Sequence, residues 1–93
     1  MTVSGGSRLG VVAIVVEDLE MVHRVNSVLH EHAQIVVGRM GIPYRDRGVS
    51  VISLIVDGSN EEISAMTGKL GRISGVSVKA AYAKLRDAGE GIG

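Results

Sequence analysis

The chain has 93 residues, enough for one domain, and its hydrophobic fraction of 45% includes two tyrosines but no phenylalanine or tryptophan. Ten Lys and Arg balance ten Asp and Glu, so no net field attracts the protein to nucleic acid or to an anionic membrane. The absence of cysteine excludes disulfides, thiolate catalysis and metal sites held by cysteine. No apolar run reaches ~18 residues and the first residues lack a signal-peptide core, so a cytoplasmic location is expected.

The first half of the chain begins with a strand and a helix. Residues 9–16 form a continuous apolar run, rich in valine, that ends at the acidic pair Glu17 and Asp18. Apolar residues then recur at helical spacing over residues 19–33, and Asp18 is placed to cap the first turn.

A hairpin is predicted next. Residues 34–42 and 49–57 have the composition of strands, and the segment between them contains Pro43, which cannot donate a ladder hydrogen bond, and Gly48, which eases the turn.

The second half ends with a helix and a strand. Ser59 and Glu62 have the spacing of a capping box, and the apolar residues after them mark one helical face that ends near residues 71–75. Residues 75–83 alternate between apolar and polar, as a half-buried strand does.

The predicted order βαββαβ is that of the ferredoxin-like α+β fold. Right-handed crossovers place both helices on one face of a four-stranded antiparallel sheet of order 4-1-3-2. We expect the domain to span residues 8–83, between a flexible N-terminus at 1–7 and a flexible C-terminal tail at 84–93.

Strand alternation assigns side chains to the two faces of this sheet. The set expected beneath the helices is Val12, Ile14, Val16, Val36, Met40, Ile42, Ile52, Leu54, Val56, Val76 and Val78. The set expected on the bare face is Val11, Ala13, Val15, Ile35, Val37, Arg39, Val51, Ser53, Ile55, Ser77 and Lys79.

The bare face is too apolar to be left in water, because soluble monomers seldom expose patches beyond a few hundred Å². We therefore expect a homo-oligomer, a dimer or a tetramer. The predicted subunit interface consists of Val11, Ala13, Val15, Ile35, Val37, Val51, Ser53 and Ile55.

Charged residues on or near that face are candidates for binding a small anionic effector. Arg39 and Lys79 share the face by alternation, and Arg45 and Arg47 lie in the hairpin loop. An unpaired charge covered by a second subunit would be costly, so a counter-charge, an anion or a path to solvent is needed.

About three quarters of the chain resembles the regulators of the iron-only hydrogenase system, small proteins with an ACT-like ferredoxin fold. The resemblance is carried by VED after the first strand, LHEH with IVVGRMGIPYR, ISLIVDG with TGKLG, and GVSVK. It implies an oligomeric regulatory module, and it adds Glu17, Asp18, Met40 and Gly41 to the effector-binding candidates. The Pro-Gly often found at the start of the first helix in amino-acid-binding ACT domains is absent here.

The topology is also similar to the sensing domain of nickel-responsive repressors, which raises a metal-binding alternative. His23 and His30 are seven residues apart and lie on nearly the same side of the predicted helix. However, Gly41 and Pro43 fall near the strand positions where those repressors have histidines, and no cysteine exists. The structural reading of His23 and His30 is that they are exposed residues on the flank of a helix; the alternative needs further ligands from a second subunit.

No catalytic motif is present, and neither enzymatic activity nor a cofactor is expected. We predict a regulatory module that senses a small ligand or contacts a partner protein, without membrane contact. The alternatives are a metal-binding sensor that uses the helix histidines and, more distantly, a nucleic-acid-binding transcriptional regulator.

Overall fold

The computed structural model describes residues 7–85. Its strands are β1 (Ser7–Val16), β2 (Val36–Tyr44), β3 (Val49–Ser59) and β4 (Val76–Tyr82). Its α-helices are α1 (Val22–Glu31) and α2 (Asn60–Gly71), and three short 3-10 helices complete the list: η2 (Leu19–Met21), η3 (Ala33–Ile35) and η4 (Arg45–Arg47).

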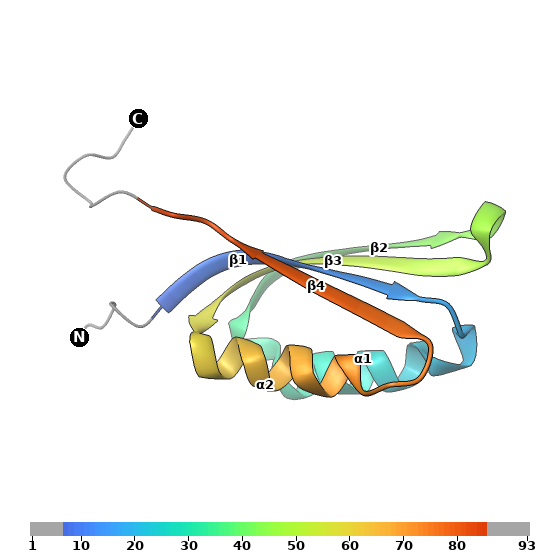
Figure 1. The fold of residues 1–93 in the computed structure, drawn as a ribbon, viewed down its shortest axis with the longest axis horizontal. Helices are drawn as coiled ribbons and strands as arrows, with labels where there is room; N and C mark the ends of the chain where they lie inside the picture. The colour runs from blue at the N-terminus through green and yellow to red at the C-terminus, as the bar shows by residue number, and fades with distance from the viewer. Residues whose placement is uncertain (1–6, 86–93) are drawn as a thin grey trace.

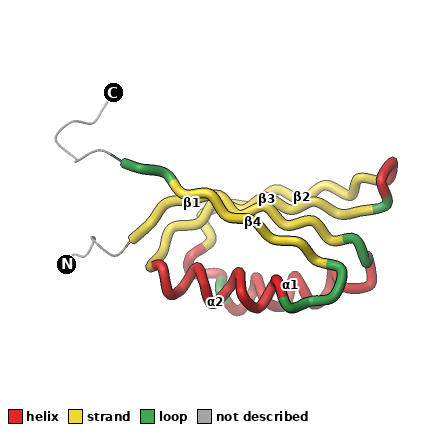
Figure 2. The backbone as a smooth tube through the Cα atoms, viewed as in Figure 1, coloured by secondary structure: helices red, strands yellow, loops and turns green. Residues whose placement is uncertain are grey.

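The four strands form one antiparallel sheet in the order β2-β3-β1-β4, and both helices lie on the same side of it (Figure 1). This is the predicted βαββαβ arrangement, read from the opposite edge of the sheet. Figure 2 shows the two layers, with α1 and α2 on one side and the strands on the other. The predicted flexible ends lie mostly outside the described residues, although Ser7 already belongs to β1.

The helix α2 begins where the sequence indicated, whereas α1 begins at Val22, three residues later than predicted. Asp18 caps η2, the 3-10 turn that leads into α1, because its Oδ1 accepts a hydrogen bond of 3.1 Å from the Glu20 N–H. At the start of α2, Ser59 Oγ accepts from the Glu62 N–H at 3.0 Å, and the Ser59 N–H donates to Glu62 Oε1 at 2.9 Å. This reciprocal pair is a complete capping box.

The core lies between the sheet and the helices. Fully or almost fully buried side chains come from the inner faces of β1 and β3, from both α-helices, from η3 and from the turn after α2. They are Val12, Ile14, Val16, Val25, Leu29, Ile35, Ile52, Leu54, Val56, Ile63, Met66, Leu70 and Ile73. Burying each such aliphatic side chain contributes roughly 1.5 to 3 kcal/mol before entropy is counted, so this layer dominates the stability of the fold.

Strand β2 departs from the predicted alternation. Val36 pairs with Val56 and Gly38 pairs with Ile55, so Val37 is an extra residue in a β-bulge. After the bulge, the side chains of β2 lie on the face opposite to the one that simple counting from residue 34 assigned.

Three face assignments were therefore wrong. Met40 pairs with Ser53 and Ile42 with Val51, which places both on the bare face, where they are 63% and 53% exposed. Arg39 pairs with Leu54 and so lies on the helix side, where its Nη2 donates to Asn26 Oδ1 of α1 at 3.1 Å.

The assignment of Ile35 was also wrong. The predicted strand starts two residues too early, because residues 33–35 form η3 rather than part of β2. Ile35 turns into the core and is only 4% exposed, so it does not lie on the bare face. Its Cγ2 packs so close to Gly58 that a Cβ there would lie 2.8 Å away.

Candidate functional site

The bare face of the sheet presents three complete rows of side chains across all four strands. The row at one end holds Gly38, Ile55, Val11 and Ala81; the middle row holds Met40, Ser53, Ala13 and Lys79; the third holds Ile42, Val51, Val15 and Ser77. Beyond the third row, Tyr44 and Val49 form one more pair next to the hairpin turn. Lys79 is the only charged residue in these three rows, and it belongs to the edge strand β4.

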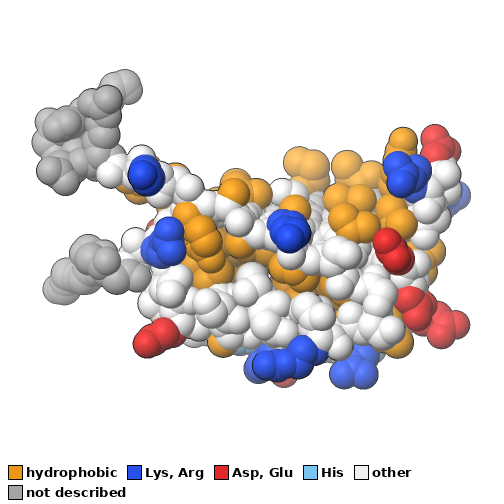
Figure 3. Space-filling view, in the orientation of Figure 1, with side chains coloured by type: hydrophobic (Ala, Val, Ile, Leu, Met, Phe, Trp, Pro, Cys, Tyr) orange, Lys and Arg blue, Asp and Glu red, His pale blue; other side chains and the backbone are white. Residues whose placement is uncertain are grey.

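This surface, which we call the bare face, is strongly apolar. Its exposed large hydrophobic residues are Val11, Met40, Ile42, Tyr44 and Ile55, and Val37 at the bulge is 66% exposed. Hydrophobic side chains gather along the upper side of the molecule in Figure 3, on the side of the sheet away from the helices. The bulge enlarges this surface, because it adds Met40, Ile42 and Tyr44 and removes Arg39.

A shallow hollow of about 520 Å³ lies at the hairpin end of the bare face. Its apolar lining comes from Val15, Val49 and Val51, and its charged groups are Glu17 and Arg47. Of the residues predicted to bind an effector, Glu17 and Arg47 lie here. Tyr44, which also lines the hollow, was not singled out from the sequence.

A second crevice, of about 330 Å³, lies on the helix side, between α1 and the edge strand β2. Arg39 reaches it from β2, and Asn26 and His30 reach it from α1. Because Asn26 and His30 are four residues apart, they lie on one side of the helix. The sequence pointed to His30 and Arg39, but it did not place them together or single out Asn26.

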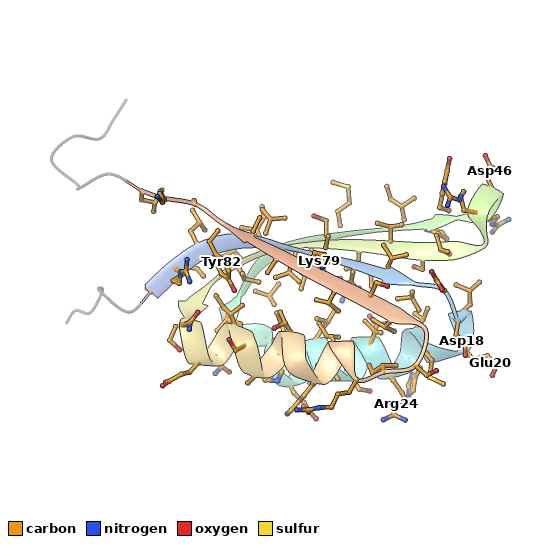
Figure 4. The ribbon with its side chains drawn as sticks, in the orientation of Figure 1. Asp18, Glu20, Arg24, Asp46, Lys79 and Tyr82 are labelled. Atoms are coloured by element: carbon orange, nitrogen blue, oxygen red, sulfur yellow. The ribbon has the colours of Figure 1, made fainter. Side chains whose placement is uncertain are left out.

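The remaining effector candidates lie apart from one another. Lys79 sits in the middle of β4 and Asp18 in the turn after β1, as Figure 4 shows. Arg45 belongs to η4 at the tip of the hairpin, and Gly41 pairs with Ile52 on the helix side of β2. The predicted set is therefore spread over several places rather than collected in one site.

The turn that holds Asp18 packs against the turn before β4. The Glu17 N–H donates to the Gly75 carbonyl at 2.7 Å, which ties the turn after β1 to the turn before β4. Gly75 has a positive φ of 78°, and a Cβ added to it would lie 2.8 Å from the Asp18 Cβ.

Two of the three histidines are exposed and one is partly covered. His23 and His30 are exposed on α1. His32 follows the helix, and its Nε2 is buried without a hydrogen-bond partner among residues 7–85. Nothing in the sequence pattern distinguished this third histidine. Across the same residues, no three His, Asp or Glu side chains lie close enough together to hold a metal ion.

Comparison with known proteins identifies the family. Residues 8–80 match the model of the TM1266-like family, whose description reads "Iron-only hydrogenase system regulator, putative". None of the curated proteins matches the chain. No helix in the described part is both long and apolar enough to cross a membrane.

Among solved structures, the chain is similar to the uncharacterized protein TM1266 from Thermotoga maritima, with 40% identity and a TM-score of 0.79. That match covers 84% of this chain and 99% of the other. The C-terminal domain of the MgtC protein from Mycobacterium tuberculosis shares the fold at 12% identity, with a TM-score of 0.65, over 94% of this chain and 99% of that one. The family match and the 40% identity together show that this chain belongs to the TM1266-like family of iron-only hydrogenase system regulators.

Proposed function

We propose that the protein is a homo-oligomeric regulatory module of the iron-only hydrogenase system whose bare face packs against a second copy, and that it responds to a small anionic effector. The observation that supports this proposal is the bare face itself. Its three rows contain one charge, and its large hydrophobic side chains are about half to two thirds exposed in a single subunit.

The arrangement of polar groups on the bare face suits a subunit contact. Protein interfaces generally have an apolar centre and a polar rim. Here Val11, Ile55 and Val51 belong to the two central strands, whereas Lys79 belongs to an edge strand. Covering the centre would gain roughly 25 cal/mol per Å² of apolar surface, while Lys79 could keep its ammonium group in water.

The bulge in β2 also removes an obstacle to this contact. An arginine on the bare face would lose hydration inside an interface and would need a partner there. Because Arg39 lies on the helix side instead, no such partner is needed. The regulatory part of the proposal rests on the family description, and the location proposed for this role is the cytoplasm.

The experiment compares the mass of the wild-type protein with that of an Ile55→Lys variant by sedimentation equilibrium. We expect the wild type to be a dimer or tetramer and the variant to be a monomer, because the new ammonium would be buried at the centre of the contact. Ala65→Lys introduces the same charge at an exposed position of α2. It should keep the wild-type mass.

Circular dichroism would show that Ile55→Lys still folds, as expected for a residue that is 47% exposed. A monomeric wild type, or an Ile55→Lys variant that assembles as the wild type does, would contradict the proposed interface.

A further inference from the structure

The crevice between α1 and β2 combines an apolar wall with a cationic rim. Leu29, Ala33 and Val36 supply the wall, while Asn26, His30 and Arg39 supply the polar groups. No acidic side chain lines it. Its volume of about 330 Å³ is at the small end of the range of ligand pockets in proteins.

Arg39 reaches this crevice because of the bulge at Val37. Its guanidinium is then held by one hydrogen bond of 3.1 Å from Nη2 to Asn26 Oδ1. A guanidinium has five N–H donors, so this contact orients the group while leaving most of its donors available. Within residues 7–85 the only ion pair joins Lys69 and Glu31, so Arg39 has no carboxylate partner there.

The other two polar residues add donors at the same place. Asn26 uses its carbonyl oxygen for Arg39, so its amide group still offers two N–H donors. An imidazole such as that of His30 can donate from a ring nitrogen. The crevice therefore presents several donors, one permanent positive charge and no acceptor that carries a negative charge.

We propose that this crevice binds a small organic monocarboxylate, with the carboxylate on Arg39 and the apolar body against Leu29, Ala33 and Val36. One guanidinium matches one carboxylate in both charge and geometry, since two parallel N–H groups meet two oxygens. A phosphate dianion would leave a second charge uncompensated, and it has no apolar part to cover the wall.

This inference names the ligand class of the proposed regulatory module and rests on that proposal. The crevice lies on the helix side of the sheet, so an oligomer formed through the bare face would leave it open. Ligand binding and assembly can therefore be measured separately on the same samples.

The experiment is a titration of the ¹⁵N-labelled full chain with isovalerate, followed by NMR. We expect the amide signals of Gly38 and Arg39 and the side-chain amide of Asn26 to shift, with a Kd of about 1 mM or tighter. Isovaleramide, a neutral molecule of the same shape, and inorganic phosphate should leave these signals in place.

Two variants and a matched control test the assigned residues. Arg39→Gln should weaken isovalerate binding about tenfold or more, because it removes the charged, forked donor. Asn26→Ala keeps every charge but releases the guanidinium, so it should weaken binding by a smaller factor. Arg72→Gln makes the same charge change at an exposed position just after α2 and should bind as the wild type does.

Several results would overturn the proposal. They are the absence of shifts with isovalerate, equal shifts with isovaleramide, preference for phosphate, or binding that Arg39→Gln leaves unchanged. Equilibrium sedimentation of the same samples separates this failure from that of the proposed function. An oligomer that does not bind isovalerate refutes only the proposed ligand site in the crevice. A monomer that binds isovalerate refutes only the proposed assembly through the bare face.

Discussion

Gly75 shows how a single residue connects two turns of this fold. Its φ of 78° lies in the left-handed region that glycine tolerates best, and its carbonyl accepts from the Glu17 N–H at 2.7 Å. The turn after β1 and the turn before β4 thus meet without an intervening side chain. The position of Asp18 depends on that close approach, because a Cβ at residue 75 would lie 3.2 Å from the Asp18 nitrogen.

Gly75→Ala should therefore lower the free energy of unfolding by about 1 to 3 kcal/mol, through backbone strain and the clash with Asp18. Urea denaturation at a fixed protein concentration measures the change, since the stability of an oligomer depends on concentration. Gly68→Ala is the control, because a Cβ there meets nothing within 4 Å in α2. It should be neutral or stabilise by up to about 1 kcal/mol. Equal stability of both variants would contradict this account of Gly75.

At the residue scale, local chemistry could be predicted and long-range contacts could not. The caps formed by Asp18 and Ser59 follow from side chains that bond within a few positions of themselves. The contact between Arg39 and Asn26 joins residues 13 positions apart, and it depends on a bulge that residue type alone did not specify. Gly38, inside a strand, was the available signal, because glycine there often marks a bulge.

At the scale of elements, the capping box shows how α2 begins. Its two hydrogen bonds satisfy backbone groups of the first turn that would otherwise lack a partner. Glu61 and Glu62 also place negative charge at the N-terminus of the helix, where the positive end of its dipole lies.

Ser59→Ala should lower the free energy of unfolding by about 1 kcal/mol, because it removes the oxygen that accepts from the Glu62 N–H. Ser64→Ala, at an exposed position in the same helix, should instead be neutral or slightly stabilising. Thermal or urea unfolding of both variants gives the comparison. If Ser59→Ala lowers the free energy of unfolding no more than Ser64→Ala does, the capping box contributes nothing to stability.

The strands illustrate where counting residues succeeds and where it fails. Alternation placed the inner side chains of β1 and β3 correctly, because those strands run without interruption through the centre of the sheet. It failed along β2, where the one unpaired residue inverts the assignment of each later position. It failed again at Ile35, because a 3-10 turn was taken for the start of the strand.

At the scale of the whole molecule, the two candidate surfaces lie on opposite sides of the sheet. The bare face is apolar and suits a second subunit, whereas the crevice between α1 and β2 is cationic and opens on the helix side. The sequence predicted the first surface from strand composition. It could not predict the second, which exists only when β2 and α1 come together with the bulge in place.

The proposed assembly should depend little on salt or on Lys79. The three rows carry no other charge, so the hydrophobic effect dominates the contact and screening by salt has little to act on. The dissociation constant of the subunits should change less than about threefold on Lys79→Gln or when NaCl rises from about 0.05 to about 0.5 M. Sedimentation equilibrium measures both. Dissociation of the oligomer under either change would show that ion pairs, rather than the apolar rows, hold the subunits together.

The exposed end of the β2–β3 hairpin bears on how long the protein persists in a cell. Residues 39–48 are exposed along their whole length, including η4 at the tip. A newly made chain thus leaves Met40, Ile42 and Tyr44 uncovered on an edge strand, a position that favours aggregation or attracts proteases and chaperones. In the proposed assembly a partner copy covers these side chains, so the abundance of the protein would follow its rate of synthesis more steeply than that of a monomer.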